Sequence, residues 1–428
     1  MAAGSRGAAK VSSALDARPE QVADRVDLAR WPAMAVPSPA PLRAALARLA
    51  FRRAARRSGV CVSLADGRSF GSRSGPVLEI TNPDSFFTRL GRDGKIGFGE
   101  SYMAGDWDAP CLGDVLEAMA RQIDSLIPPR IQWVRRLYER RHPGEEENDR
   151  DGSRRNVARH YDLSNELFAA FLDESMTYSA ALFESGCETL ARAQERKIGR
   201  LLDATRVGRG SRVLEIGTGW GELALQAARR GARVTTVTLS EEQAALARRK
   251  VESAGMTPWI DIRVEDYRDV TGQFDAIISV EMIEAVGERW WPEYFRTLDE
   301  RLAPSGRIGL QSILIGHDRL VATKSSWTWI HKYIFPGGLI PSEEAIRQTL
   351  SAHTGLHVVD QLRFGDSYAT TLRRWRNQFD AHTDAVVQLG VDRTVRRMWD
   401  FYLAYSEAGF RSGYIDVAQF VLEKEGSA

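Results

Sequence analysis

Short apolar runs alternate with helical patterns along the second half of the chain. Four of them are short and rich in β-branched or aliphatic residues, which predicts buried strands at Arg212 to Ile216, Ala232 to Leu239, Ile260 to Val264 and Phe274 to Val280. A fifth strand is expected at Arg307 to Ile313. Strands separated by helices build an α/β fold with a doubly wound, Rossmann-like parallel sheet. Such sheets bind ligands at the carboxyl ends of their strands.

A glycine-spaced turn follows the first of these strands. Gly217, Gly219 and Gly221 permit a tight turn and let a ligand approach the bare backbone. The chain from Glu222 to Arg229 then resumes as an alanine-rich helix whose first amides point at that ligand. The spacing matches neither the dinucleotide fingerprint nor the phosphate loop of nucleotide hydrolases, so the neighbouring residues must identify the ligand.

Polar residues at two strand ends favour S-adenosylmethionine over a dinucleotide. Glu215 ends the first strand and suits the methionine portion of this cofactor, and Asp266 and Tyr267 follow the third strand and suit adenine. No phosphate-binding lysine accompanies the glycine turn. These residues together predict a methyl donor as the ligand.

The acid that usually meets the ribose hydroxyls is absent from the end of the second strand. Thr238, Ser240 and Gln243 stand there and could donate and accept hydrogen bonds instead. Alternatively, Ser240 caps the next helix and Gln243 completes a capping box, and both roles can hold together.

The first part of the chain contains a helix with an unusual charge pattern. Residues 1–40 are rich in Ala, Ser, Pro and Arg without apolar periodicity, which predicts a mobile tail. Pro41 to Arg57 then places leucines at helical spacing among six arginines and no acid, which predicts a basic amphipathic helix. Such a helix lies on an anionic membrane surface, or it covers its own domain with its arginine stems, and the pattern leaves both readings open.

A smaller α+β domain is expected to surround this helix. Strands are predicted at Val60 to Leu64 and Val77 to Ile80, and a short helix at Ser85 to Leu90. The aromatic and glycine-rich stretch from Gly97 to Trp107 fits a substrate-facing wall or core packing equally well. A polar stretch at 143–155 predicts the linker to the second domain.

Composition narrows the class of protein. The 428 residues, 43% of them hydrophobic, are enough for two domains with sizeable cores, and the formal net charge of +1 excludes a strong global field toward nucleic acid. No apolar run is long enough to span a membrane and no secretory signal is present, which predicts a cytoplasmic location. The scattered cysteines Cys61, Cys111 and Cys187 indicate neither a disulfide framework nor a metal site.

Two carboxylates interrupt an apolar run after the fourth strand. Glu281 and Glu284 lie within VEMIEAVG, at the end of the sheet where a reacting group should lie. A buried carboxylate is costly unless it is used or paired. Glu284 is therefore the leading candidate for a catalytic residue; the alternative is a structural carboxylate held by an arginine or a backbone amide.

Seven motifs are the most specific signal in the chain: HYDLSNELF (160–168), MTYSAALF (176–183), VLEIGTGWGELALQAA (213–228), VTLSEEQ (237–243), EDYRD (265–269), VEMIEAVG (280–287) and KYIFPGGLIPS (332–342). Together they resemble the cyclopropane-fatty-acyl-phospholipid synthase family. The resemblance implies a class I methyltransferase domain over 156–428 that binds S-adenosylmethionine, partly through Tyr178 and Ser179, and an N-terminal lipid-contacting domain over 41–142. It also implies methyl transfer to the cis double bond of an unsaturated acyl chain in a phospholipid.

The same resemblance implies a site for the base. Family members use bound bicarbonate as the proton acceptor, held by a glutamate matching Glu284, a tyrosine matching Tyr368 and the backbone of an isoleucine matching Ile313. Two positions depart from the family pattern, because Ala180 replaces a cysteine and Gln311 replaces a histidine. These two departures affect how the base is held.

The departures also bear on the product. Loss of a proton from the new methyl group after a hydride shift gives an exomethylene branch, whereas direct closure gives a cyclopropane ring. VEMIEAVG with Gln311 resembles the actinobacterial subgroup that makes methylene-branched, tuberculostearic-type chains, in which a separate reductase acts next. We expect the protein to act at the anionic inner face of the cell membrane. The sequence does not decide whether it forms a homo-oligomer. A methyltransferase of small polar amines and a non-catalytic lipid-binding protein are the alternatives.

Overall fold

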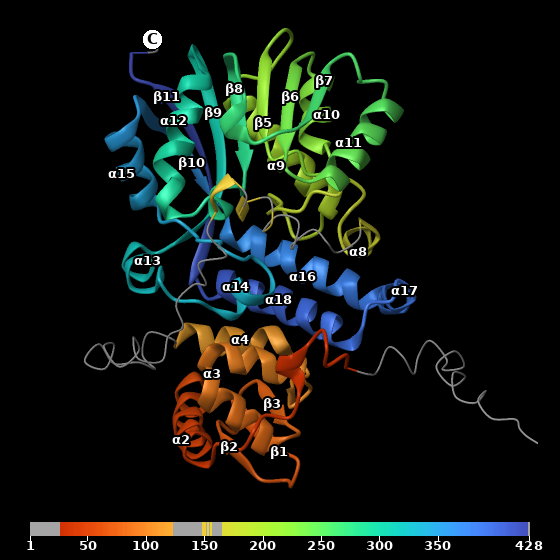
Figure 1. Ribbon diagram of the computed structural model, residues 1–428, viewed down its shortest axis with the longest axis vertical. Coiled ribbons are helices and arrows are strands. Elements are labelled where there is room, and N and C mark those ends of the chain that lie inside the picture. The colour runs from red at the N-terminus through yellow and green to blue at the C-terminus, as the bar shows by residue number, and fades with distance from the viewer. Residues whose placement is uncertain (1–25, 123–147, 151, 154, 156–164, 427–428) are drawn as a thin grey trace, which may run out of the picture.

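The computed structural model describes residues 26–122, 148–150, 152–153, 155 and 165–426. Its N-terminal strands form a four-stranded sheet in the order β2-β1-β3-β4, in which β1 runs antiparallel to β2 and parallel to β3. This α+β unit lies at one end of the molecule (Figure 1). Its elements are α2 (Pro41–Ser58), β1 (Cys61–Leu64), β2 (Ser69–Gly71), β3 (Val77–Ile80), α3 (Pro83–Met103), β4 (Trp107–Asp108) and α4 (Leu112–Arg121).

Helix α3 is much longer than the sequence predicts. The pattern indicates a helix only from Ser85 to Leu90, yet α3 continues to Met103 across a non-helical residue at Gly94. Glycines lower helix propensity, but packing overrides propensity here, because Tyr102, Met103 and Trp107 are all buried in the core. The buried side chains of the stretch from 97 to 107 agree with the core-packing alternative.

Part of the predicted N-terminal tail belongs to the folded structure. Residues 32–34 form a short 3₁₀ helix, η1 (Pro32–Met34), and Met34 is buried. The Arg89 guanidinium donates to the carbonyl oxygens of Met34 and Ala35 at 3.0 and 2.8 Å. Residues 1–25 of the predicted tail, and 143–147, 151 and 154 of the predicted linker, lie outside the described residues.

A seven-stranded sheet forms the core of the larger unit. Its order is β10-β11-β9-β8-β5-β6-β7; β5 to β9 are parallel, and β11 runs antiparallel to both neighbours. The strand order reverses at β5, and ligands bind such sheets outside the carboxyl ends at this point. The strands are β5 (Arg212–Ile216), β6 (Arg233–Thr238), β7 (Ile260–Val264), β8 (Phe274–Val280), β9 (Leu302–Ile315), β10 (Leu356–Arg363) and β11 (Ile415–Lys424).

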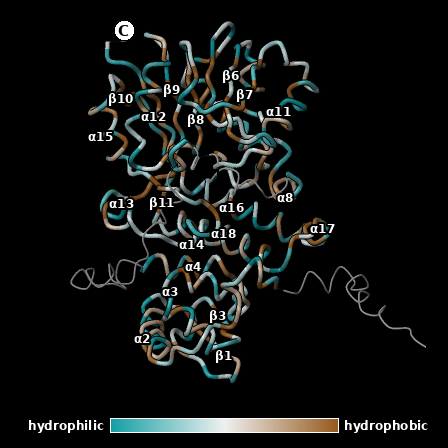
Figure 2. The backbone as a smooth tube through the Cα atoms, in the orientation of Figure 1, coloured by the Kyte–Doolittle hydropathy of each residue, from teal (hydrophilic) through white to brown (hydrophobic). Residues whose placement is uncertain are grey.

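Helices cover both faces of this sheet, and the alternating strand residues explain how. Leu214 packs in one apolar cluster with residues of α12 (Trp291–Arg301) and α15 (Glu343–His353). Its neighbour Val213 packs in a second cluster with α9 (Leu190–Ala204) and α10 (Glu222–Arg229). Successive strand residues point to opposite faces, so a strand buried on both faces must be apolar throughout. Figure 2 shows hydrophobic stretches in the strands of the sheet, interrupted by hydrophilic residues.

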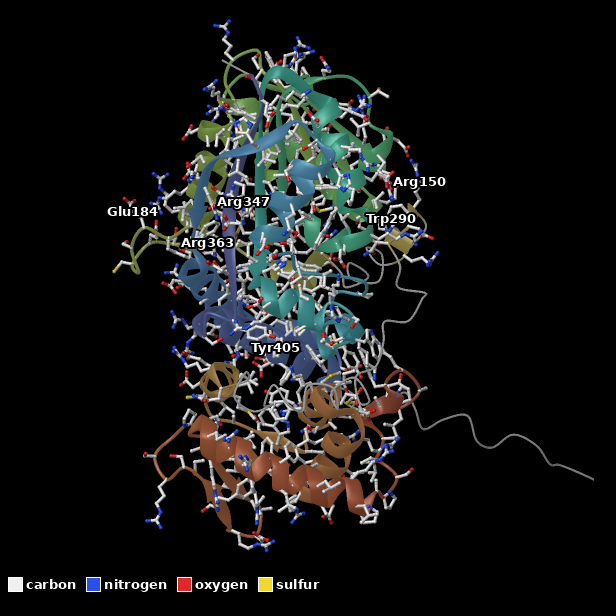
Figure 3. The ribbon with its side chains drawn as sticks, turned by 90° about the vertical axis from the view of Figure 1, so that its left-hand side faces the viewer. Arg150, Glu184, Trp290, Arg347, Arg363 and Tyr405 are labelled. Carbon is white, nitrogen blue, oxygen red and sulfur yellow. The ribbon has the colours of Figure 1, made fainter. Side chains whose placement is uncertain are left out.

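Two long helices separate the sheet from the N-terminal unit. Helices α16 (Gly365–Ala381) and α18 (Arg393–Arg411) cross the molecule between them (Figure 1), and α18 contacts both α3 and α4. Figure 3 places Tyr405 of α18 at this junction. The remaining described helices are α8 (Asn165–Ala169), α11 (Glu241–Ser253), α13 (His317–Thr323), α14 (Trp329–Tyr333), α17 (Thr383–Gln388), η4 (Tyr267–Asp269), η5 (Ile283–Ala285) and η6 (Glu288–Trp290).

The aromatic and glycine-rich segment 327–338, which we call the aromatic insertion, lies between β9 and α15 and joins the two units. Trp329 of α14 packs 4.8 Å from Phe401 of α18 in an edge-on arrangement, and its Nε1 contacts Met103 Sδ of α3 at 3.3 Å. Glu100 of α3 accepts a hydrogen bond from Tyr333 at 2.8 Å. The insertion therefore fixes the N-terminal unit against α18. Within the described ranges, none of the helices is both long and apolar enough to cross a membrane.

Candidate active site

The turn after β5 leaves an open backbone surface at the carboxyl edge of the sheet. Gly217 and Gly221 have φ angles of 96° and 89°, which residues with side chains rarely adopt. A Cβ atom on Gly217 would lie only 2.8 Å from Met282 Sδ. Gly221 caps the N-terminus of α10, so the unpaired first amides of that helix are available beside the turn. The predicted strand, glycine turn and helix are therefore present.

Glu215 ends β5 beneath this turn with one oxygen unpaired. Its side chain is buried, and Oε2 has no hydrogen-bond partner. Burial raises the pKa of Glu215 to about 8, although the Thr236 hydroxyl and the Lys197 ammonium oppose the rise. An orphaned carboxylate oxygen at this edge is a fit partner for the positively charged methionine portion of S-adenosylmethionine.

The residues predicted to meet the ribose bond to one another at the end of β6. Thr238 Oγ1 donates to Gln243 Oε1 at 3.0 Å, and Ser240 Oγ accepts from the Gln243 amide at 3.2 Å. Ser240 therefore caps α11 as predicted. The Gln243 side-chain oxygen accepts from Thr238, and the Ser240 backbone amide donates to Thr238 Oγ1 at 3.1 Å, so the second half of the predicted capping box does not form. A role of these residues at the ribose stays a prediction.

The predicted adenine residues follow β7. Asp266 is buried against Arg268, which donates to its two oxygens at 2.8 and 2.7 Å. Burial would raise the pKa of Asp266, but the hydrogen bonds and charge of Arg268 outweigh it and lower the pKa. The ring of Tyr267 packs edge-on against Tyr294, with 5.5 Å between centroids. Asp266 therefore stays ionised and fixed, and its contact with adenine stays a prediction.

The segment that contains Tyr178 and Ser179 is held from below by α9. Gln194 Nε2 donates to the carbonyl oxygens of Thr177 and Ser179 at 3.2 and 2.9 Å. The buried Lys197 Nζ donates to Ser179 Oγ at 2.8 Å. The Tyr178 hydroxyl in turn bonds to the Tyr402 hydroxyl of α18 at 2.8 Å. The sequence motif therefore forms a rigid strap between the sheet and α18.

Glu284 lies in η5, past the end of β8, and points toward β9. Its Oε1 accepts from the Ile313 amide at 2.5 Å and from Ser312 Oγ at 3.0 Å, whereas Oε2 is buried without a partner. Burial raises the pKa of Glu284 to about 8, and the charge of Glu281 adds to the rise. The predicted neighbours Glu284 and Ile313 are therefore brought together, and the carboxyl group is largely protonated near neutral pH.

Glu281 lies at the centre of the side chains on the Glu284 side of the site, which we call the acceptor side. The sequence pattern assigned no role to Glu281. Its Oε1 accepts from the Ala180 amide at 3.0 Å and from Gln311 Nε2 at 2.8 Å, and its Oε2 accepts from Tyr368 Oη at 2.7 Å. The backbone φ of Glu281 is 54°, a left-handed value that costs a residue with a side chain roughly 1 to 2 kcal/mol. Ala180, Gln311 and Tyr368 therefore lie together as predicted, but they surround the Glu281 carboxylate and not a bound bicarbonate.

The bicarbonate that the resemblance implies does not fit this arrangement. The Ala180 amide and the Tyr368 hydroxyl each have one hydrogen to donate, and both hydrogens go to Glu281. The Ile313 amide is engaged by Glu284. The donors assigned to a bound anion are therefore already satisfied by carboxylates of the chain itself.

Two further buried side chains complete the acceptor side. Lys197 is 1% exposed; burial lowers its pKa to about 8, although Glu281, Asp173 and Glu215 favour its charged form. Gln419 Nε2 of β11 donates to Gln311 Oε1 at 3.0 Å, which turns the Gln311 amide group toward Glu281. Lys197 lies on the apolar face of the helix at 190–204, and a lysine at such a position is the sequence feature that could have identified it.

The other charged groups of the larger unit are mostly paired at its surface. Arg347 and Arg363 lie close together on the outside of α15 and β10 (Figure 3), and Glu343 accepts a hydrogen bond from each. Within the described part of the chain, no group of three or more His, Cys, Asp or Glu side chains is arranged to hold a metal ion.

Comparison with known proteins places this site in a family. The family model for mycolic acid cyclopropane synthetase matches residues 148–420. The chain is 49% identical over 413 residues to tuberculostearic acid methyltransferase UfaA1 of Mycobacterium tuberculosis, covering 94% of this chain and 97% of the relative. It is 33% identical over 350 residues to cyclopropane-fatty-acyl-phospholipid synthase of Escherichia coli K12, covering 81% of this chain and 87% of the relative.

Solved structures agree with this placement. The cyclopropane synthase MmaA2 from Mycobacterium tuberculosis superposes with a TM-score of 0.59 at 30% identity, covering 63% of this chain and 98% of that one. Mycolic acid cyclopropane synthase CmaA1, complexed with SAH and CTAB, gives a TM-score of 0.59 at 29% identity with the same coverage. By sequence and by fold, the chain belongs to the mycolic acid cyclopropane synthetase family.

Proposed function

We propose that the protein transfers a methyl group from S-adenosylmethionine to the cis double bond of an oleoyl-type acyl chain in a phospholipid, giving a methylene-branched chain. The observation that carries the proposal is the carboxylate pair Glu281 and Glu284, at the same sheet edge as the glycine turn. An alkylated alkene must lose a proton, so its enzyme needs a base beside the reacting carbon. The 49% identity to a tuberculostearic acid methyltransferase supports the branched product.

The aromatic side chains around Tyr178 suit the charge that develops on the acyl chain. The bound cofactor would supply a methyl group on a positively charged sulfur, and the weakly nucleophilic alkene gains positive charge as it accepts that group. The rings of Phe168 and Trp375 lie 5.2 and 5.3 Å from the ring of Tyr178. Aromatic faces stabilise a cation, and a closed aromatic wall keeps away water that would trap it.

Helix α2 supports access to a lipid surface. Leu42, Leu46 and Leu49 are 82%, 67% and 66% exposed on one face, opposite the buried Phe51. Arginines flank these leucines along the helix, a combination that binds anionic membranes. We place the protein at the inner face of the cell membrane on this basis, with a separate reductase converting the methylene branch to a methyl branch.

The test is the structure of the product lipid. The purified chain is incubated with oleoyl phospholipid vesicles, with and without S-adenosylmethionine, and the acyl chains are analysed by mass spectrometry and ozonolysis. We expect a cofactor-dependent gain of one methylene unit and ozone cleavage at a retained double bond. Resistance to ozone would assign a ring instead. No gain in mass with a saturating cofactor would contradict the proposed activity.

A further inference from the structure

The carboxylate of Glu281 fills an anion-binding pocket made by the protein itself. The Ala180 amide, Gln311 Nε2 and Tyr368 Oη converge on its two oxygens at 3.0, 2.8 and 2.7 Å. We propose that Glu281 is the catalytic base and takes the place of an external anion such as bicarbonate. This inference rests on the proposed function, because it identifies the group that receives the proton from the alkylated acyl chain.

The hydrogen bonds leave little capacity for a second anion. The Ala180 amide and the Tyr368 hydroxyl have no further hydrogen to give, and the second Gln311 hydrogen faces the Ala180 carbonyl oxygen at 3.5 Å. The amide oxygen of Gln311 is occupied by Gln419, so the side chain cannot turn away without breaking that bond. A free anion would have to displace Glu281 from every one of these donors.

The backbone conformation of Glu281 indicates that the surrounding structure holds this residue in place. Its φ of 54° lies in the region that glycine adopts freely and that other residues avoid. Strained conformations of this kind persist mainly where the surrounding structure enforces them, and they gather at active sites. The strain here places a carboxylate in the pocket, and glycine at this position would relieve the strain while emptying the pocket.

Donors and charge distinguish the surroundings of the two carboxyl groups. Burial raises the pKa of Glu281, and the Ala180, Tyr368 and Gln311 hydrogen bonds and the charge of Lys197 oppose this rise. Glu284 has no cation among the causes that shift its pKa, and the charge of Glu281 helps to raise that pKa to about 8. A raised pKa suits a carboxylate that must accept a proton.

The proposed step balances with Glu281 as acceptor. Methyl transfer forms a carbon–carbon bond to one alkene carbon and breaks the methyl–sulfur bond, whose electron pair stays on sulfur. A hydride shift moves the electron deficiency to the carbon that carries the new methyl group. A C–H bond of that methyl group then breaks, its electron pair forms the exomethylene double bond, and the proton passes to a Glu281 oxygen.

The experiment compares Glu281→Gln and Glu281→Gly with the unaltered protein, in buffer freed of bicarbonate and in buffer containing it. We expect Glu281→Gln to lower kcat by about 100-fold or more, because it keeps the shape but removes the base, with cofactor affinity retained. Glu281→Gly should be inactive without bicarbonate and regain activity with bicarbonate or formate. The unaltered protein should be indifferent to both. Glu288→Gln, at an exposed residue paired with Lys324, is the matched control.

Thermal unfolding supplies a readout that needs neither cofactor nor turnover. Bicarbonate should raise the unfolding temperature of Glu281→Gly and leave the unaltered protein unchanged, because only the variant has an empty pocket. Stabilisation of the unaltered protein by bicarbonate, loss of its activity in bicarbonate-free buffer, or near-normal turnover of Glu281→Gln would each overturn the assignment. An unaltered protein that makes no methylated lipid in either buffer would instead defeat the proposed function, while the unfolding data still decide what fills the pocket.

Discussion

The two sides of the active site are built in different ways. The cofactor side is built around one continuous stretch, 212–229, in which a strand, a glycine turn and a helix offer mainly backbone groups, and the residues predicted to meet ribose and adenine follow β6 and β7. The acceptor side gathers side chains from the ends of β8 and β9, from α16 and from the strap at 177–180. The difference teaches that the backbone fixes what delivers the methyl group, whereas a few side chains decide what happens to the acceptor.

Each side nevertheless contains one carboxyl group that burial keeps neutral. Glu215 on the cofactor side and Glu284 on the acceptor side both have pKa values raised from 4.5 to about 8, chiefly by burial. Lys197 lies within electrostatic reach of Glu215 and of Glu281, and so links the two sides. Binding of a cationic cofactor should therefore change the ionisation of Glu215 and leave that of Glu284 as it is.

The largest expected effect is on stability as a function of pH. Below pH 4.5 both carboxyl groups are protonated in folded and unfolded chains alike; between 4.5 and about 8 only the unfolded chain ionises, which lowers the free energy of unfolding. The loss is on the order of 3 to 5 kcal/mol per group. Glu215→Gln and Glu284→Gln should each unfold at a higher temperature than the unaltered protein at about pH 8, but not at about pH 5.

The cofactor distinguishes the two sides in the same measurement. With saturating S-adenosylmethionine, the advantage of Glu215→Gln at high pH should disappear, because the ligand's positive charge then stabilises the ionised Glu215. The advantage of Glu284→Gln should remain. Equal behaviour of the two variants with and without the cofactor would contradict the assignment of one carboxyl group to each side.

A smaller effect is expected from the glycine turn, where two positions provide a matched pair. Gly217→Ala combines a φ of 96° with a Cβ only 2.8 Å from Met282 Sδ, whereas a Cβ on Gly219 meets nothing within 4 Å. We expect Gly217→Ala to weaken cofactor binding by about tenfold or more, and Gly219→Ala by roughly threefold, measured by calorimetry. Met282→Ala should partly restore binding to Gly217→Ala. Equal losses at both glycines would show that φ alone matters.

The same contrast explains what could be predicted from the sequence. Strands β5, β7 and β8 begin and end at the predicted residues; β5 and β8 are mostly buried and mostly apolar, whereas the edge strand β7 alternates apolar residues with Asp261 and Arg263. Strands β10 and β11 were missed; half of the β10 residues are polar, and only Leu356 of that strand is buried. Glu281 was missed because its partners lie 101, 30 and 87 residues away in sequence, and no local pattern encodes a left-handed glutamate. Glu284 was found because carboxylates in an apolar run are a local signal, and the resemblance to the family pointed to this one of the two.

The smallest expected effect lies outside both sides, on the exposed face of α2. Leu46→Ser should lower partition of the protein onto anionic phospholipid vesicles by roughly threefold to tenfold, because the variant buries less apolar side-chain area in the lipid. Val359→Ser is the matched control, because Val359 is 41% exposed on β10, at the opposite end of the molecule (Figure 1).

Arg48 and Arg52 of α2 already stack on Phe87 and Phe70 of their own unit, so part of the basic charge covers the domain and the leucines carry the test. Turnover of a detergent-dispersed substrate should be the same for Leu46→Ser and Val359→Ser, because neither residue lies near the carboxylates. If both variants partition equally onto vesicles, α2 is an ordinary surface helix and the acyl chain reaches Glu281 from another face. If only Leu46→Ser is impaired, lipid capture and proton removal are separate properties of separate regions, and the chemistry can be studied without the membrane.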